Sequence, residues 1–181
     1  DGKDDEAVWK RAPLGTGFQE REPNLGGEPK YPTSFQIAYD ENFIYVMIRA
    51  DMPADQIRVR TLQRDSFGVF GDSAVSVKLD AHHDRRSAVN LAVNADGAQI
   101  DIMVLEDGRV GIREWDAVWE AEVQQREDGY DAEFKIPFAI LGIKGGKEFT
   151  MGLDITRDEP QLNTTYDWRL IVPPRHPVSA S

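Results

Sequence analysis

A two-residue alternation of apolar with small or polar side chains between residues 72 and 101 constrains the fold of this chain most strongly. It runs through two segments, at 74–79 and 88–93, and enters a third at 100–104, with Gly97 in the turn before the third. A period of two is typical of strands that bury one face, and it never drifts toward the helical period of 3.6. The stretch therefore predicts a β-meander, with function expected on its polar face or at the polar corner after its first strand.

Similar alternation recurs on both sides of the meander. Strands are expected at 35–39, 43–48, 56–60, 119–123, 130–136, 149–155 and 168–172, with loops at 14–32 and 157–165. Pro137 suits the first position of a helical turn, so one short helix is expected at 138–141, closed by Gly142. Roughly nine to eleven short strands predict an all-β fold, an antiparallel β-sandwich of the jelly-roll or immunoglobulin-like kind.

The length of 181 residues fits one domain, 1–181, that buries a core without metals or disulfides. A net charge of −11 argues against a nucleic-acid partner, and the absence of cysteine excludes a disulfide scaffold and thiol chemistry. No apolar run approaches the roughly 20 residues of a membrane helix, so this domain is not expected to insert into a membrane. The chain begins at Asp1 rather than at Met, and we expect it to be part of a longer chain.

Ser73 follows Gly71-Asp72, and with Asp80 and His83 it supplies the residue types of a serine hydrolase. Ser73 begins a predicted strand, whereas the nucleophile of such hydrolases lies between a strand and a helix. Pairs of carboxylates for glycoside hydrolysis arise by chance in a chain with 32 acidic residues, and a solvated strand face explains them better. The chain is therefore predicted not to be an enzyme.

Calcium is the one cofactor that the sequence suggests. The acidic N-terminus could supply oxygen ligands from Asp1, Asp4, Asp5 and Glu6. The alternative is an acidic terminus that binds no metal. His82 and His83 are a weaker metal site, because adjacent side chains on an extended corner point to opposite sides, and a polar turn is the favoured interpretation.

Aromatic residues are the best sequence signal for a sugar ligand, because a pyranose stacks its apolar face on an aromatic ring while its hydroxyls pair with polar side chains. Trp119 is in strand phase with Ala121 and Val123 and is assigned to the core. Phe70, next to a glycine, and Trp168, beside a polar stretch, are freer to face a ligand.

The order and spacing of several short motifs resemble the carbohydrate-binding module family 9-like domains, in the version found at the N-terminus of bacterial proteins of unknown function that continue into a predicted outer-membrane barrel. The resemblance covers nearly the whole chain and rests on motifs such as Arg64-Asp65, Val93-Asn94-Ala95-Asp96-Gly97, Trp115-Asp116-Ala117-Val118-Trp119 and Ile136-Pro137-Phe138. It implies a β-sandwich without catalysis in this domain. It also implies a periplasmic, outer-membrane-associated or secreted location, with the remainder of a larger chain as a partner.

The resemblance also implies a ligand site. In sugar-binding members two tryptophans sandwich a terminal glucose, helped by a glutamate and by other polar side chains. Phe70 and Ser76 fall where the first tryptophan and the glutamate would be, and Trp168 matches the second tryptophan. The implied carbohydrate-binding residues are Phe70, Trp168, Arg64, Ser76, Asn90 and Asn163.

Two hypotheses follow. The preferred one is a non-catalytic carbohydrate-binding module of an exported bacterial protein, with an aromatic platform and polar contacts to the sugar. The alternative is a structural or interaction domain of a larger outer-membrane-associated protein that has lost the sugar site. Phe70 and Ser76 favour the alternative, because they replace a larger stacking surface and a charged acceptor.

Overall fold

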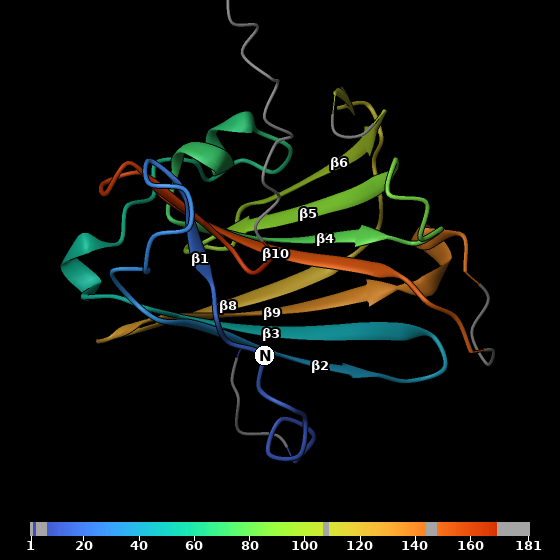
Figure 1. Ribbon diagram of the computed structural model, residues 1–181, viewed down its shortest axis with the longest axis horizontal. Helices are drawn as coiled ribbons and strands as arrows, with labels where there is room; N and C mark the ends of the chain where they lie inside the picture. Colours follow the sequence, from blue (N-terminus) through green and yellow to red (C-terminus); the bar gives the residue numbers. More distant parts are fainter. Residues whose placement is uncertain (1, 3–6, 107–108, 144–147, 170–181) are drawn as a thin grey trace, which may run out of the picture.

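The computed structural model (Figure 1) describes residues 2, 7–106, 109–143 and 148–169. Two antiparallel sheets pack face to face. The larger has the order β1-β11-β10-β4-β5-β6-β7, formed by Gln19–Glu22, Thr164–Asp167, Gly152–Glu159, Ala74–Asp80, Ala88–Asn94, Gln99–Leu105 and Val110–Ile112. The smaller has the order β2-β3-β9-β8, formed by Thr33–Tyr39, Phe43–Asp51, Gly129–Pro137 and Glu120–Arg126.

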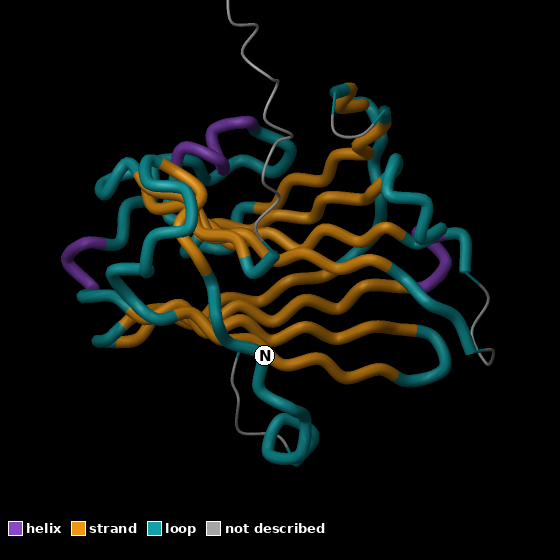
Figure 2. Tube along the Cα trace, in the orientation of Figure 1, coloured by secondary structure: helices purple, strands orange, loops and turns teal. Residues whose placement is uncertain are grey.

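Helical structure is limited to three short 3-10 turns in the part of the chain that the structure describes (Figure 2). They are η1 (Ala54–Gln56), η2 (Phe67–Gly71) and η3 (Phe138–Leu141). The third is the predicted short helix, and Gly142 closes it in the left-handed region at φ 69°. None of the described helical segments is long and apolar enough to cross a membrane.

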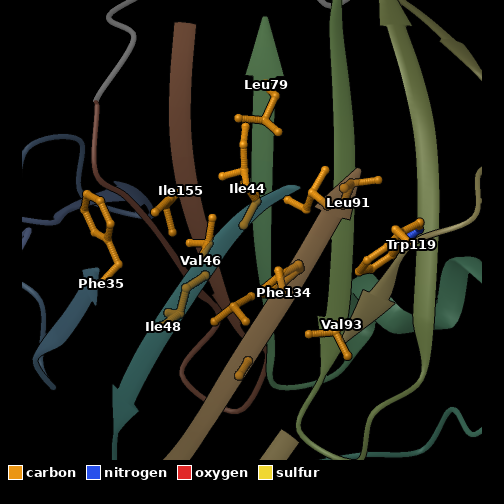
Figure 3. Packing of buried hydrophobic residues seen from close by; sticks show 14 of the residues in the cluster. Phe35, Ile44, Val46, Ile48, Leu79, Leu91, Val93, Trp119, Phe134 and Ile155 are labelled. Atoms are coloured by element: carbon orange, nitrogen blue, oxygen red, sulfur yellow. The ribbon is translucent and has the colours of Figure 1, made fainter. Parts of the chain in front are cut away.

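The predicted meander is β4-β5-β6, and its alternation decides which side chains enter the core. Val77 of β4 lies opposite Leu91 of β5, and both are fully buried between the sheets. From the smaller sheet, Val46 and Phe134 pack into the same cluster (Figure 3). The β-sandwich that the period of two predicted is confirmed.

The structure differs from the prediction at Val110–Ile112, which form the unexpected strand β7, and at four longer stretches. Residues 14–32 contain β1, an edge strand of charged and amide side chains without apolar alternation. Residues 56–60 are not a strand, because their backbone is tied to Asp72 and Ser73 by bonds such as Arg60 N to Asp72 Oδ1 (2.9 Å). The strand expected at 149–155 begins at Gly152 and ends at Glu159, so it includes the first residues of the loop that was expected at 157–165. The last described strand is Thr164–Asp167, so the strand expected at 168–172 is displaced, and its residues 170–172 lie outside the described part.

A buried ion pair on β10 explains why this region resembles a loop in sequence. Arg157 and Glu159 are fully buried on the inner side of the strand, and Arg157 Nε donates to Glu159 Oε1 at 2.6 Å. The guanidinium also donates to the smaller sheet and its flank, at Thr33 Oγ1 (2.9 Å) and at the carbonyl oxygens of Pro32 (3.1 Å) and Asp51 (2.9 Å). Arg157 therefore joins the two sheets.

Replacing this arginine should be costly. Arg157→Met leaves the Glu159 carboxylate buried without its cation and removes the guanidinium donor from the Asp51 carbonyl and the Thr33 hydroxyl, so we expect a loss of about 3–5 kcal/mol in the free energy of unfolding. Urea unfolding measures it. The control is Lys135→Met, which removes an ion pair with Glu120 whose two side chains are 35% and 69% exposed and should cost less than about 1 kcal/mol. Equal losses in the two variants would contradict the role assigned to Arg157.

Candidate functional site

Polar side chains gather on the outer side of β4, β5, β10 and β11. The pairing register puts them on one side, because Ser76 lies opposite Thr156 and Lys78 lies opposite both Asp154 and Asn90. We call this patch the polar face; it consists of Ser76, Lys78, Asn90, Asp154, Thr156, Asp158, Thr165 and Asp167.

A chain of hydrogen bonds runs across the polar face. Lys78 Nζ donates to Asp154 Oδ2 at 3.3 Å and to Thr156 Oγ1 at 2.6 Å. The Thr156 hydroxyl donates to Asp167 Oδ1 at 3.0 Å, and Arg21 of β1 pairs with Asp167 Oδ2 at 3.3 Å. The side chains of Arg21 and Lys78 remain 37% and 29% exposed, so the cations are the part of this network that solvent reaches most.

Burial shifts the pKa of two carboxyl groups on the polar face. It raises the pKa of Asp154, although the nearby charge of Lys78 opposes the shift. Burial also raises the pKa of Asp158, against the hydrogen bond that Thr165 Oγ1 donates to it at 2.9 Å. With Asp167, these groups give the polar face three carboxyl groups against the two cations Lys78 and Arg21.

Asn90 is the residue of the polar face whose hydrogen bonding is incomplete. Its side chain is 9% exposed, and its Oδ1 atom is buried without a hydrogen-bond partner. A buried acceptor without a donor is destabilising, by about 1–3 kcal/mol for a typical polar group. A ligand hydroxyl that reached this atom would supply the missing donor.

The turn η2 packs on the outer side of the same sheet and bounds the polar face at one end. Val69 is fully buried there against Ala74, Ala92 and Ile100, and Phe70 packs against this cluster. Ser66 caps the turn through its hydroxyl, which accepts from the Gly68 backbone N–H. Phe70 thus lies on the same side of the sheet as Ser76 and Asn90, and these three predicted residues are brought together on one face.

Trp168 lies on the other side of the sheet. Its backbone N–H bonds to the Ile155 carbonyl at 2.9 Å, which continues the ladder and puts the indole on the inner side with Ile155. The ring contacts Phe35 edge-to-face, with centroids 4.8 Å apart, and the indole N–H donates to the Thr16 carbonyl at 3.1 Å. The register therefore separates Trp168 from Phe70.

Two further predicted residues, Arg64 and Asn163, are not part of the polar face. Arg64 donates to Asp101 Oδ1 at 3.1 Å and lies over the Trp119 ring at 5.8 Å, at an end of the sandwich. Trp119 is buried as expected and stacks on Phe134 with centroids 5.7 Å apart. Asn163 is exposed in the turn between β10 and β11, with a φ of 51°.

Several acidic side chains shape the loops. Asp101 accepts from the Trp119 indole N–H and the Ala117 backbone N–H, both at 3.0 Å. Asp72 accepts from the backbone N–H groups of Arg60 and Thr61 and from the Asn94 side chain, which fixes the segment before η2. The hydrogen bonds of these two carboxylates hold loops of the domain in place.

The hydrolase residues are also part of the framework. Ser73 is fully buried, and its hydroxyl donates to Glu159 at 2.8 Å and accepts from the Arg58 backbone N–H at 3.1 Å. Asp80 accepts from backbone N–H groups of the corner that follows it, and His83 lies in that corner with a φ of 51°. The corner is a polar turn, as the sequence indicated.

The predicted calcium ligands fall at the N-terminus. Asp1, Asp4, Asp5 and Glu6 lie outside the described residues. Within the described ranges, no group of three or more His, Asp or Glu side chains is placed to hold a metal ion.

Sequence reasoning missed most of the polar face. The missed residues are Lys78, Asp154, Thr156, Asp158, Thr165 and Asp167. A signal was present, since Leu153 and Ile155 alternate with Asp154, Thr156 and Asp158 and would have extended the strand beyond 155. Arg157 and Glu159 occupy the next inner positions, and because they are charged, the apolar alternation stops at Ile155 and the end of the strand is not visible in the sequence.

The two packed antiparallel sheets make this chain a β-sandwich domain, with the polar face on the outer side of the larger sheet. The chain matches the family model described as carbohydrate family 9 binding domain-like over residues 1–169, and it belongs to that family. A comparison with curated proteins gave no match.

Solved structures of a carbohydrate-binding module family 9 domain from Caldicellulosiruptor kristjanssonii have the same fold. The structure in complex with glucose is 15% identical in sequence, with a TM-score of 0.67, and the match covers 93% of this chain and 79% of that one. The structure in complex with cellotriose is 16% identical, with a TM-score of 0.64 and coverage of 93% and 77%.

The raised pKa of Asp158 predicts a pH-dependent effect of its replacement. The folded chain keeps this carboxyl protonated to a higher pH than the unfolded chain, whose Asp pKa is about 3.9, so ionisation lowers the stability as pH rises. Asparagine cannot ionise and still offers an oxygen to Thr165. We therefore expect Asp158→Asn to gain stability relative to the unmodified protein between pH 4 and pH 7, as measured by urea unfolding.

Asp40→Asn is the matched control of opposite sign. Bonds from the Asn42 and Phe43 backbone N–H groups lower the pKa of Asp40, so its ionised form stabilises the fold at neutral pH. This variant should lose stability relative to the unmodified protein as pH rises from about 2 to about 4.5, and its relative stability should stay nearly constant above that. A relative stability of Asp158→Asn that falls with pH would contradict the electrostatic account of the polar face.

Proposed function

We propose that this domain is a non-catalytic carbohydrate-binding module and that it binds a neutral sugar on the polar face. Family membership supports the ligand class, together with relatives whose structures hold glucose and cellotriose. The proposal places the sugar over Asn90 and beside Ser76, with Phe70 at the edge of the site.

The buried oxygen of Asn90 carries the proposal. Its neighbour across the strands, Lys78, donates to Asp154 and Thr156, and Asn90 Oδ1 has no donor from the protein. A sugar hydroxyl supplies such a donor. The excess of carboxylates over cations on the polar face favours a neutral sugar over an anionic one.

A specific observation favours the second candidate, a structural or interaction domain. Trp168, the match for the second stacking tryptophan, packs against Phe35 on the inner side of the sheet, and Ser76 replaces the glutamate. A domain of this kind would hold a protein surface and bind no glycan. An isolated domain that binds nothing on a broad glycan array, with and without calcium, would establish this candidate in place of the first.

We also propose that the protein is exported, to the periplasm, the outer membrane or the medium. The family resemblance and the absence of cysteine agree with this. Fractionation of the producing cells tests it, and recovery of the protein from the cytoplasm alone would exclude it.

Asn90→Ala separates sugar binding from stability. The substitution removes one hydrogen bond to the ligand, so titration calorimetry with cellotriose should show about a 2- to 12-fold loss of affinity, equivalent to roughly 0.5–1.5 kcal/mol. Because it also removes a buried acceptor without a partner, the free energy of unfolding should stay the same or rise. Glucuronate should bind more weakly than glucose.

Asn163→Gly is the control for this experiment. Asn163 has a positive φ that glycine adopts without strain, and it is exposed in the turn after Glu159, five residues further along β10 than Asp154, which lies level with Lys78 and Asn90. Its replacement should leave the affinity for cellotriose unchanged. If affinity is lost in Asn163→Gly and retained in Asn90→Ala, the sugar site is not on the polar face.

A further inference from the structure

A cavity of about 930 Å³ opens between the two sheets, at the end of the sandwich that carries the turn between β2 and β3. Its inner wall is apolar and comes from both sheets and from η3. The side chains that form it include Ile37, Val46, Leu79, Phe138, Met151 and Leu153.

The topology explains why this end is open. β2 is an edge strand of the smaller sheet, and in the described part of the chain β11 pairs with β10 only from Thr156 onward. Trp168 and Phe35 close the space between the sheets on the side of β11. The stretch from Met151 to Leu153 pairs with β4 on one edge, and on its other edge the described part of the chain has no strand; the cavity lies there, facing the β2–β3 hairpin.

Buried and exposed side chains meet in this cavity. Val46 and Leu79 are 0% and 1% exposed, whereas Tyr39 and Phe149 at its mouth are 79% and 39% exposed. Phe149 packs edge-to-face on Phe138, with centroids 5.3 Å apart. The cavity therefore joins a deep apolar floor to an aromatic entrance, which is the usual composition of a site for a small molecule.

Among the described residues, three carboxylates line the mouth of the cavity. Asp40, Glu41 and Glu148 line it, and none of the described lining residues is Lys, Arg or His. Asp40 accepts from the backbone N–H groups of Asn42 at 2.7 Å and Phe43 at 2.8 Å, which lower its pKa and keep it ionised. An apolar anion would meet three carboxylates, whereas an apolar cation would bury its chain and keep its charge beside them.

We propose that this cavity is a second binding site, for a small apolar molecule that carries an ammonium or quaternary ammonium group. The apolar part lies between the partly buried side chains of Ile37 and Leu153, and the cation lies at the mouth beside Glu41 and Glu148. The site is separate from the polar face, because the inner side chains of β10 form it and the outer ones form the polar face. It does not depend on sugar binding.

The test compares two probes with the same ten-carbon chain, decyltrimethylammonium and decanoate, each below its micelle concentration. In nuclear magnetic resonance titrations of the chain 1–181, the cation should shift the methyl signals of Leu79, Met151 and Leu153 and bind at least about tenfold more tightly than the anion. High salt should narrow the difference, because the carboxylates at the mouth are exposed and screened.

Two variants test the chemistry. Glu41→Gln combined with Glu148→Gln should reduce the preference for the cation to about threefold, with little effect on folding because both side chains are exposed. Leu153→Trp fills the cavity and should abolish binding of both probes, whereas the control Leu62→Trp, at a position 79% exposed and outside the cavity, should bind as before. Asn90→Ala should leave the affinity for the cation unchanged.

Equal affinity for the two probes would overturn the assignment of a cationic ligand. Shifts confined to the polar face would overturn the location, and the absence of binding by either probe would overturn the site itself. None of these outcomes bears on cellotriose, so failure here is distinguishable from failure of the proposed sugar site.

Discussion

Arg157 fixes the position of β10, on which both proposed sites depend. Its guanidinium is fully buried and bonds to Glu159 on its own strand and to three groups at the edge of the smaller sheet. A buried charge is tolerated only when its hydrogen bonds are complete, so the two sheets have one favourable alignment at this end. Asp101 of β6 makes a comparable connection to the segment before β8, because it accepts hydrogen bonds from the Trp119 indole and the Ala117 backbone. The Arg64 guanidinium lies over the Trp119 ring at the same place. Between the Arg157 and Asp101 hydrogen-bond networks, the two sheets pack through apolar side chains.

The elements that sequence reasoning predicted well are those in which alternation of hydrophobicity and the strand coincide. β2, the meander and the pair of β8 and β9 each bury one apolar set, so their period is visible without a structure, whereas β3 is recognisable as a continuous apolar run that is buried on both faces. β1 could not be found this way, because Gln19-Glu20-Arg21-Glu22 holds its place by pairing with β11 and not by burying apolar side chains. The second half of β10 has a charged inner face, which resembles a loop until its partners are known.

For the candidate site, residue types were predictable and their geometry was not. Phe70, Ser76 and Asn90 share one side of the larger sheet, as a ligand site requires. Whether Trp168 joins them depends on its pairing with Ile155, and a register between strands distant in sequence cannot be obtained from composition or spacing. Asp154, Thr156 and Asp158 were missed for the same reason that the end of β10 was missed.

The alternation of β10 has a consequence for how the domain tolerates change. Successive residues of this strand serve opposite surfaces, since Asp158 faces outward between the inward-facing Arg157 and Glu159. Point replacements at outward positions can alter the chemistry of one surface while the interior stays intact. A single inserted or deleted residue before Arg157 would exchange the two sets, moving a carboxylate into the core and the arginine to solvent. Diversification of ligand preference in such a domain is therefore expected to proceed by substitution within β4 and β10, with changes of length confined to the connecting turns.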